Sequence, residues 1–421
     1  MGLFYCMIAT RVCIIGAGPG GATAALQLNR EEVDCVVVDK AVFPRDKVCG
    51  DGLSGKVLTC LQKIDPAIAE RLKGAGFKVN SWGVSFAAPN RQLLGIGYRP
   101  DFDADNAAHR QTPIGYVCKR WNFDHFLVQE LKRCPHVKLF EGKHIIKYEL
   151  QPDGYLVSDG KGFEVKASLL IIAGGAHAAF TKQVAGIAME PKHYMAGIRA
   201  YYKGVAGMHP RHFIELHFLK NLLPGYFWIF PLPNGEANVG IGMLSEAVHR
   251  GKVNLKKELV HIVENDPVFK ERFKNATLQG TIEGYGLPLG SKKRRLSGTR
   301  FMLVGDAGYL IDPFTGEGIG NAMGSGRLAA LQAARAIQAN DFSAAGLAKY
   351  DMEIERVFGP ELRLSTRIQK LVNYPRLFNF FINIGAKNKK VQELLSCMFY
   401  EVDLRKKLTK PSFYLQLLFN K

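Results

Sequence analysis

The stretch that decides the fold is "RVCIIGAGPGGATAALQLNR", from Arg11 to Arg30. A short β-branched run leads into Gly16-x-Gly18-x-x-Gly21, and an alanine-rich pattern with helical periodicity follows it. Glycines at these positions permit a sharp turn, let the backbone approach a pyrophosphate, and allow close packing of a helix on a strand. The amino terminus of the predicted helix then offers free N–H groups and a partial positive charge to the phosphates.

A second strand is predicted directly after this helix. The run "DCVVVDK" places Asp39 eighteen residues past Gly21, where a carboxylate accepts hydrogen bonds from a ribose. Strand, turn, helix, strand and acid in this register predict a dinucleotide site in a Rossmann-like α/β domain. A glycine-rich turn that binds nothing is the alternative.

A second glycine-spaced element near the other end of the chain separates NAD from FAD. In the segment from Arg300 to Ala339, a predicted strand ends at Gly305-Asp306, and a glycine-spaced loop and a long helix follow. A flavin needs such an element, because its ribityl chain requires a polar anchor that Asp306 provides. The helix that starts near Gly316 directs N–H groups at the ring edge, where negative charge collects on reduction. The predicted cofactor is therefore FAD.

Taken in order, these motifs resemble the flavoprotein monooxygenase superfamily with the p-hydroxybenzoate hydroxylase fold. Within it the chain is most similar to the geranylgeranyl reductase family, which uses reduced FAD to saturate isoprenoid double bonds in lipids. The resemblance covers roughly residues 10–340. It rests on "GAGPGG" (16–21), "FPRDKVCG" (43–50), "YVCKRWNFDHFL" (116–127), "PGYFWIFPLPNGEANVGIG" (224–242) and "VGDAGYLIDPFTGEGI" (304–319).

The resemblance assigns cofactor roles to particular residues. Arg45 and Arg120 match basic positions that neutralise phosphate or ribose oxygens, although Arg120 could instead be a surface charge after a turn. The implied FAD-binding residues are Gly16, Gly18, Gly21, Asp39, Arg45, Arg120, Gly305, Asp306, Pro313, Gly316, Gly318 and Ile319.

Three residues are implied at the reaction centre. The K-x-C-G pattern places the Cys49 thiol at the floor of the substrate cavity, where it positions the substrate or assists proton delivery; a packed hydrophobe is the alternative. Asp51 departs from the glycines that some relatives carry. Tyr226 and Trp228 share one face of a predicted strand and line the cavity above the flavin, or they serve only structure. Flavin halogenases carry W-x-W-x-I-P at this place.

A metal centre and disulfides are not expected. The eight cysteines form no C-x-x-C pair, and no histidine cluster accompanies them at metal-ligand spacing. The amino end does not resemble a secretory signal, so we expect reduced thiols and a cytoplasmic protein.

The predicted domain organisation is discontinuous. Residues 8–80, 111–180 and 286–365 form the FAD-binding domain, and residues 81–110 and 181–285 form an antiparallel-sheet substrate domain inserted between them. Residues 366–421 form a basic helical segment. The run "SKKRRLSGTR" (291–300) is expected to be a solvated basic loop.

The charge predicts an anionic partner. The chain carries a formal net charge of +18, and the segment from Thr366 holds 11 Lys and Arg against 3 Asp and Glu, a local net of +8. Apolar runs between these cations suit an anionic surface at the inner face of the membrane, or they pack back onto the FAD domain. No nucleic-acid-binding motif is present, so nucleic acid is not an expected partner.

The expected function is FAD-dependent reduction of a carbon–carbon double bond in an isoprenoid or other long apolar substrate. Two alternatives stay open: a flavin-dependent monooxygenase or halogenase, and a membrane-associated flavin electron-transfer protein. Hydroxylases carry an Asp-Gly pair where this chain has Gly174-Gly175. That departure leaves the electron donor open between NAD(P)H and a ferredoxin-type protein.

Overall fold

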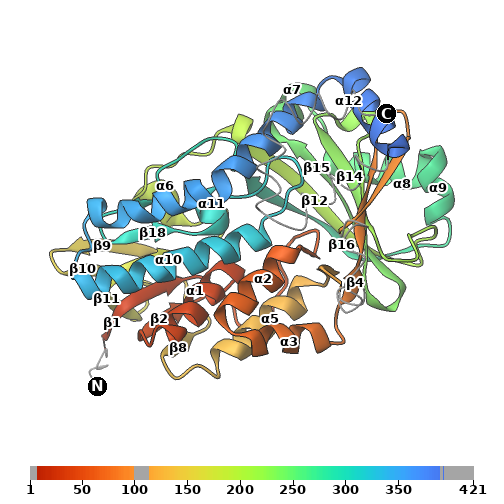
Figure 1. Cartoon of the computed structure of the whole chain (residues 1–421). Helices are drawn as coiled ribbons and strands as arrows, with labels where there is room; N and C mark the ends of the chain where they lie inside the picture. Colours follow the sequence, from red (N-terminus) through yellow and green to blue (C-terminus); the bar gives the residue numbers. More distant parts are fainter. Residues whose placement is uncertain (1–6, 99–112, 389–391, 393–421) are drawn as a thin grey trace.

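The structure is a computed structural model that describes residues 7–98, 113–388 and 392. Figure 1 shows two large sheets side by side, with helices packed around the sheet that contains β1 and with the seven-stranded sheet at the other end of the molecule. This mixed α/β architecture is the predicted fold class.

The first sheet is built on the glycine-motif strand β1 (Ile8–Ile15). β1 pairs in parallel with β2 (Cys35–Val38) and with β11 (Glu164–Ile172). Every residue of β2 is buried, as expected for a parallel strand that is covered on both faces. The other strands are β8 (Val137–Phe140), β9 (Lys147–Gln151), β10 (Gly154–Ser158), β17 (Ser297–Gly298) and β18 (Phe301–Leu303).

Helices α1 (Pro19–Arg30) and α10 (Ile319–Ala339) cross at very short range. A Cβ on Gly326 of α10 would lie 2.1 Å from the Gly20 carbonyl oxygen, and a Cβ on Gly20 would lie 3.1 Å from the Ala322 carbonyl oxygen. Only glycine allows this approach. The crossing places the first turns of both helices beside each other. The surrounding helices are α2 (Gly55–Ile64), α3 (Pro66–Gly74), α5 (Arg120–Leu131), α6 (Ala179–Gln183) and α11 (Ala344–Leu371).

The second sheet has seven strands in the order β16-β12-β15-β14-β13-β5-β6. Its pairings are antiparallel, as the alternating aromatic pattern predicts, except that β13 and β5 run parallel. The strands are β5 (Gly83–Ala87), β6 (Leu93–Gly97), β12 (Tyr194–Lys203), β13 (Ile214–His217), β14 (Gly225–Pro231), β15 (Glu236–Leu244) and β16 (Thr277–Pro288).

The two faces of β14 have different neighbours. Phe227 and Ile229 join a core with helices α8 (Leu255–Asn265) and α9 (Pro267–Phe273). Tyr226, Trp228 and Phe230 lie in a second cluster on the other face. The predicted period-2 alternation is confirmed, and it presents one aromatic face of the sheet to the FAD-binding part of the chain.

A three-stranded sheet joins the two parts. It consists of β3 (Gly52–Leu53), β7 (Gly115–Val117) and β4 (Val79–Ser81), in the order β3-β7-β4. The expected segment boundaries do not coincide with element ends everywhere: the one after residue 365 falls inside α11, and the one before residue 286 falls inside β16. The boundary at residue 110 lies outside the described residues.

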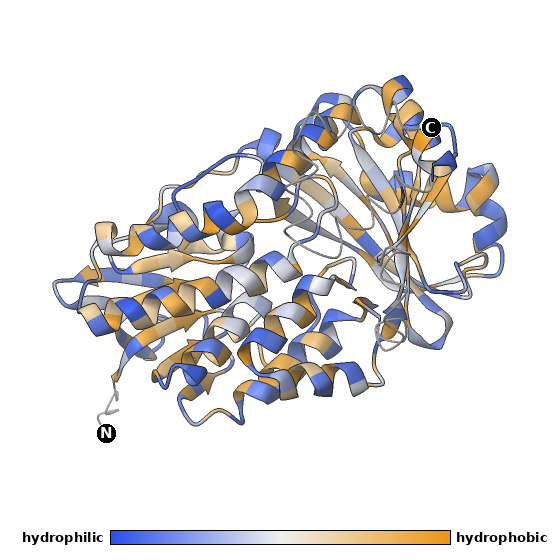
Figure 2. Ribbon diagram, viewed as in Figure 1, coloured by the Kyte–Doolittle hydropathy of each residue, from blue (hydrophilic) through white to orange (hydrophobic). Residues whose placement is uncertain are grey.

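Helix α12 (Pro375–Lys387) packs mainly on the seven-stranded sheet, against β6. Phe378 and Ile382 belong to the cluster on the aromatic face, and the Phe378 ring lies 4.9 Å from that of Phe218. Figure 2 shows hydrophobic residues along α12 next to hydrophilic ones. Within the described residues, no helix combines the length and the apolar character that crossing a bilayer requires. The remaining apolar runs predicted in the tail lie outside the described residues.

Candidate functional site

The glycine turn before α1 has two kinds of glycine. A Cβ on Gly16 would lie 2.4 Å from the Ala173 carbonyl oxygen, and a Cβ on Gly21 would lie 1.8 Å from the Gly16 carbonyl oxygen. Gly16 also has φ +106°, so both positions exclude a side chain for reasons of fold. Gly18 is different, because a Cβ there would meet only guanidinium atoms, at 3.6 Å from Arg45 Nη2 and 4.0 Å from Arg120 Nη2.

Two arginines therefore flank the amino terminus of α1. Arg120 donates twice to Asp124, both at 2.6 Å, and Arg45 Nη1 lies 2.6 Å from Asp124 Oδ2. Arg120 is only 2% exposed, so its interpretation as a surface charge is wrong. Burial works to raise the pKa of the Asp124 carboxyl, yet Arg120 and then Arg45 hold that pKa below its usual range. Asp124 is the residue of this cluster that the sequence interpretation missed.

The Asp39 carboxylate ties the end of β2 to the glycine turn. Its Oδ2 accepts from the Ala17 backbone N–H at 2.7 Å, and its Oδ1 accepts from the Ala41 N–H at 2.8 Å. Each carboxylate oxygen has two lone pairs, so both can still accept from a ribose hydroxyl. The structure therefore brings Asp39 to the same turn as Gly16 and Gly18.

The second glycine element lies beside the first through the α1–α10 crossing. Gly305 has φ +59° and donates its N–H to Ser325 Oγ at 3.0 Å. Asp306 pairs with Lys47 at 2.9 Å, so the predicted ribityl anchor is held by a lysine from the segment that carries Cys49. The loop that follows has Gly316 at φ +72°. Pro313 and Ile319 are buried, and Gly318 is the amino-terminal cap of α10.

These groups suit a dinucleotide with a pyrophosphate. Neither Gly18 nor Gly318 supplies a side-chain cap to its helix, and no acidic residue occupies the first turn of α1 or α10. The amino terminus of α1 thus offers free N–H groups, with added positive charge from Arg45 and Arg120. At the start of α10 beside it, the Gly320 N–H donates to Glu317 Oε1 at 2.6 Å, so the anion-binding donors gather at α1. The donor set fits FAD.

The Cys49 segment lies against the aromatic face of β14. A Cβ on Gly50 would lie 3.1 Å from Phe230 and 3.8 Å from Trp228 Nε1, and a Cβ on Gly52 would lie 3.4 Å from Phe230. Cys49 itself is half-buried and packs against the core of the FAD-binding part. Burial raises the pKa of the Cys49 thiol, so it is protonated at neutral pH.

A buried polar network lies under this segment, and the sequence interpretation missed most of it. Asp51 is fully buried with φ +66°, and its Oδ2 accepts from Tyr201 Oη and Asn238 Nδ2, each at 2.8 Å. Burial raises the pKa of Asp51 to about 6, although the hydrogen bonds from Asn238 and Tyr201 oppose that shift. Asp51 stood out as a departure from the glycine run. Nothing in the sequence marks Tyr201 or Asn238.

Both predicted aromatic residues have their polar atoms paired within the protein. Tyr226 Oη donates to the Thr315 carbonyl oxygen at 2.7 Å, which attaches β14 to the loop between Asp306 and α10. Trp228 Nε1 donates to Asn238 Oδ1 at 2.8 Å. With these donors engaged and only 6% and 8% of the residues exposed, the two rings take part in the site as apolar packing groups rather than as hydrogen-bonding groups.

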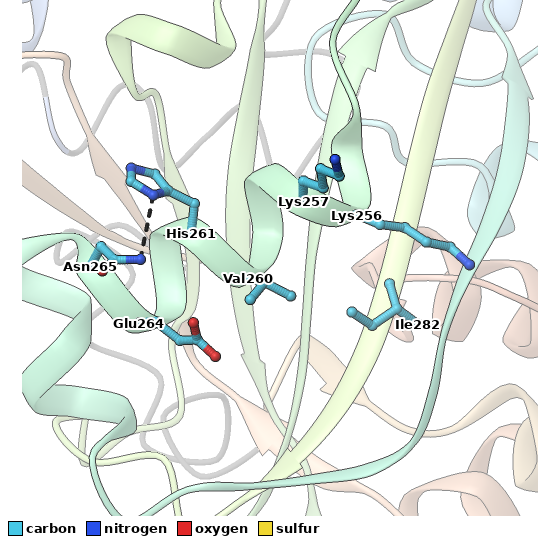
Figure 3. Close-up of a pocket in the computed structure, with 7 residues that line it drawn as sticks. All are labelled: Lys256, Lys257, Val260, His261, Glu264, Asn265 and Ile282. Carbon is cyan, nitrogen blue, oxygen red and sulfur yellow. Dashed lines mark hydrogen bonds between the residues drawn. The ribbon is translucent and has the colours of Figure 1, made fainter.

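No metal-binding group of three or more His, Cys, Asp or Glu side chains occurs in the described part of the chain. A hollow of about 390 Å³ lies on α8 and β16, lined by Lys256, Lys257 and Glu264 among others (Figure 3). None of the predicted site residues lines this hollow.

Comparison with known proteins identifies the fold and the cofactor. Residues 9–238 match the model of the FAD binding domain family. The chain is 29% identical over 324 residues to menaquinone reductase of Mycolicibacterium smegmatis, covering 76% of this chain and 75% of that protein. It is 30% identical over 356 residues to digeranylgeranylglycerophospholipid reductase of Thermoplasma volcanium, covering 82% of this chain and 83% of that protein.

Solved structures share the architecture. A geranylgeranyl bacteriochlorophyll reductase-like protein from Thermoplasma acidophilum superimposes with a TM-score of 0.79 at 22% identity, covering 96% of this chain and 99% of that one. The flavin-dependent brominase Bmp2 superimposes with a TM-score of 0.74 at 20% identity, covering 94% and 95%. Likeness at these identities shows the fold alone. The family match and the sequence relatives show more: the chain is an FAD-dependent oxidoreductase that belongs to the geranylgeranyl reductase family.

Proposed function

We propose that the protein reduces carbon–carbon double bonds in an isoprenoid or another long apolar lipid. The observation that carries this proposal is a contact between the aromatic face of β14, here called the aromatic wall (Tyr226, Trp228 and Phe230), and the loop between Asp306 and α10, here called the flavin loop. Tyr226 Oη donates to the Thr315 carbonyl oxygen of that loop, and Trp228 lies in the same cluster as Tyr226. An apolar chain that lies on this wall is held beside the flavin loop. The names of the relatives, menaquinone reductase and digeranylgeranylglycerophospholipid reductase, support a lipid substrate.

The residues around the site align the substrate and handle one proton. FAD, when bound and reduced, supplies the hydride. Tyr226 and Trp228 orient the chain and exclude water, because neither ring has a donor to spare for it. Cys49 carries a protonated thiol beside this wall and is our candidate for positioning the double bond or delivering the proton to its second carbon. Asp51 accepts from the same Asn238 amide that donates to the Cys49 carbonyl oxygen, so we assign it to positioning the Cys49 turn rather than to contacting the substrate.

The electron donor we propose is a ferredoxin-type protein rather than NAD(P)H. Gly174 stands where hydroxylases carry the aspartate that helps connect the pyrophosphate with NAD(P)H. In the structure a Cβ on Gly174 would already lie 3.3 Å from the Ala178 Cβ, so this turn is packed closely without a side chain.

We also propose that α12 attaches the protein to an anionic membrane surface. Leu377, Phe380 and Phe381 are exposed on this helix, with Phe380 54% exposed, while Phe378 and Ile382 hold it on the sheet. Cations at Arg376 and Lys387 accompany the exposed rings. A helix with an apolar outer face and cationic flanks suits the headgroup region of a bilayer.

Mass spectrometry of lipid extracts tests the reaction. Extracts are incubated anaerobically with the FAD-loaded protein and dithionite, and lipids that gain two hydrogens per step are sought. Reduction of a double bond in an isoprenoid or other long apolar chain is the expected result. Oxygen or halide incorporated into a product under air, with no hydrogen gain, would instead favour the monooxygenase or halogenase alternative.

A further inference from the structure

The basic loop before β17 borders a second pocket, apart from the FAD and substrate residues described above. It has a volume of about 750 Å³ and lies between the loop 290–296, the turn 308–310 and helix α11. This size falls within the ordinary range for small-molecule sites, which is roughly 300–1,000 Å³. No role proposed above uses this pocket.

The lining is strongly cationic. Its positive residues are Lys292, Lys293, Arg294, Arg295, Arg363, Arg367 and Lys370, and its acidic residues are Asp351 and Glu355, an excess of 7 − 2 = 5 positive charges. Both acids already have protein partners. Asp351 accepts from the Leu296 N–H and from Ser297 Oγ, and Glu355 pairs with Lys293 and Arg363. Glu190, outside the lining, pairs with Lys292 at 2.8 Å and lies 3.6 Å from Arg294, so the cations of the lining still outnumber the acids around them.

Arg294 is the cation that distinguishes this pocket from an ordinary basic surface. The loop was expected to be solvated, but the Arg294 side chain is only 6% exposed, and its guanidinium carbon lies 4.3 Å from the centre of the Tyr309 ring. Nη1 donates to the Lys292 carbonyl oxygen at 3.0 Å. Nη2 has no hydrogen-bond partner among the described residues, and its nearest acid, Glu190, is 3.6 Å away and already binds Lys292 at 2.8 Å.

A buried guanidinium with an unused donor is costly in an empty site. The cost is offset when an anion accepts from the free N–H groups. Tyr309 holds the guanidinium plane by its ring, so the donors keep a fixed orientation. The fork of an arginine matches two oxygens of a phosphate, and the surplus of cations over acids around the pocket favours a ligand with more than one negative charge.

The floor of the pocket is apolar. Leu296, Leu310, Ile354 and Leu362 are buried there, and Met352 is exposed at its edge. A free inorganic anion would leave this floor unused. A ligand with a phosphate at one end and a hydrocarbon chain at the other would use both parts of the lining.

We propose that this pocket binds the phosphate group of an amphiphilic lipid, with the phosphate at Arg294 and the first part of the chain on the leucine floor. The pocket extends along α11 to Lys370, five residues before α12 begins. A lipid taken from a bilayer on which α12 rests would therefore be close to the pocket. The proposal does not rest on the reaction proposed above, because it concerns binding alone.

Calorimetric titration of the FAD-loaded full-length protein tests the proposal with three probes, of which the two lipids are kept below their micelle-forming concentrations. The probes are dioctanoyl phosphatidic acid, dioctanoyl phosphatidylcholine and inorganic pyrophosphate. Phosphatidic acid should bind at least about tenfold tighter than either of the others, since charge-assisted hydrogen bonds of this kind are worth that much. Its affinity should fall with added salt.

Two variants and a matched control locate the binding. Arg294→Gln and the double variant Arg363→Gln/Arg367→Gln should each weaken phosphatidic acid binding about tenfold or more. The double variant changes only exposed side chains, so it is expected to fold and keeps the test valid even if Arg294→Gln does not fold. Lys256→Gln/Lys257→Gln removes two charges from the hollow of Figure 3 and should change nothing.

Each other outcome contradicts a stated part of the proposal. If phosphatidylcholine binds as tightly as phosphatidic acid, the surplus cations of the pocket do not select the ligand. Equal binding of pyrophosphate means that the ligand is a soluble phosphate and not a lipid. The site itself is overturned by any of three results. The folded pocket variants bind phosphatidic acid as tightly as the wild type, the Lys256→Gln/Lys257→Gln control loses as much affinity as they do, or the wild type does not bind phosphatidic acid at all.

Discussion

Asn238 donates its side-chain amide to the Cys49 carbonyl oxygen at 2.7 Å, across 189 residues of sequence. The same nitrogen donates to Asp51 Oδ2, and the amide oxygen accepts from Trp228 Nε1, both at 2.8 Å. One buried side chain therefore fixes the turn that carries Cys49 against the aromatic face of β14. The relative position of Cys49 and Trp228 depends on this amide rather than on the flexible glycines around the cysteine.

Cys49→Ser tests whether the thiol acts on the substrate. The hydroxyl keeps the volume but changes polarity and acidity, so FAD content and melting temperature should stay close to those of the wild type. Double-bond reduction per bound flavin should fall about a hundredfold or more if the thiol delivers the proton, the usual range for loss of a proton-transfer group. Cys134→Ser changes a half-buried thiol that donates to the Glu130 carbonyl and should retain full activity. A Cys49 variant that is unstable yet fully active per flavin would make the thiol structural.

Gly18→Val tests the cofactor site. A Cβ at Gly18 makes only ordinary contacts with Arg45 and Arg120, so the fold should survive the substitution. The new side chain occupies the space between the two guanidinium groups where the pyrophosphate is expected. The purified variant should therefore be colourless, while the wild type is yellow with bound FAD, as measured by flavin absorbance. Gly76→Val, at an exposed glycine with open space around it, should keep its flavin. A yellow Gly18 variant would disprove the assignment.

The glycine motifs could be found from the sequence because their physical requirement is local. Gly16 and Gly21 are excluded from carrying a side chain by atoms of their own turn and of the adjacent strand end, so spacing alone reveals them. The alternation on β14 is local too, and it assigned Tyr226 and Phe227 to opposite faces.

The residues that sequence reasoning missed depend on segments far apart in the chain. Lys47 reaches Asp306 across 259 residues, and Tyr201 reaches Asp51 across 150. No periodicity records such contacts. Arg294 was expected in solvent because its neighbours are all cationic, but burial of one member of a loop is decided by the helix and the turn that pack on it. The segment boundary expected after residue 365 falls inside a helix, because α11 continues through Leu371.

Phe380→Ser/Phe381→Ser tests membrane attachment by α12. Both rings are about half exposed, so their removal should leave the melting temperature nearly unchanged. Cosedimentation with anionic liposomes should fall several-fold, because the apolar area that enters the headgroup region is lost. Leu150→Ser removes an equally exposed apolar residue on β9 and serves as the control. Equal sedimentation of all three proteins would leave α12 as packing on the sheet.

Anaerobic reduction of the bound flavin tests the electron donor. NADPH at stoichiometric concentration should bleach the flavin absorbance slowly, at least about tenfold slower than dithionite or a reduced ferredoxin, because Gly174 supplies no carboxylate to the NAD(P)H side. Stopped-flow absorbance under nitrogen gives both rates with one protein preparation. Rapid bleaching by NADPH would show that the departure at Gly174 has no consequence.

Asp51 should give the protein a pH-dependent stability of known sign. Burial raises the pKa of this carboxyl to about 6 from its ordinary 3.8, so the folded state holds the proton more tightly than the unfolded chain does. Its contribution to the free energy of unfolding is fully present below about pH 4, falls as the pH rises through about 6, and is then constant. The size is at most about 3 kcal/mol.

Asp51→Asn isolates that contribution, because the amide does not titrate while other groups cancel in the difference from wild type. Urea unfolding at about pH 4.5 and about pH 7.5 should show the stability of the wild type, relative to this variant, decreasing at the higher pH. Asp153→Asn is the control of opposite sign. Lys166 holds the pKa of the Asp153 carboxyl below its usual range, so its contribution is already complete at about pH 4.5 and stays constant upward. If the difference in unfolding free energy between the wild type and Asp51→Asn is also the same at both pH values, then Asp51 is ionised throughout this range. The hydrogen bonds from Tyr201 and Asn238 would then outweigh the effect of its burial.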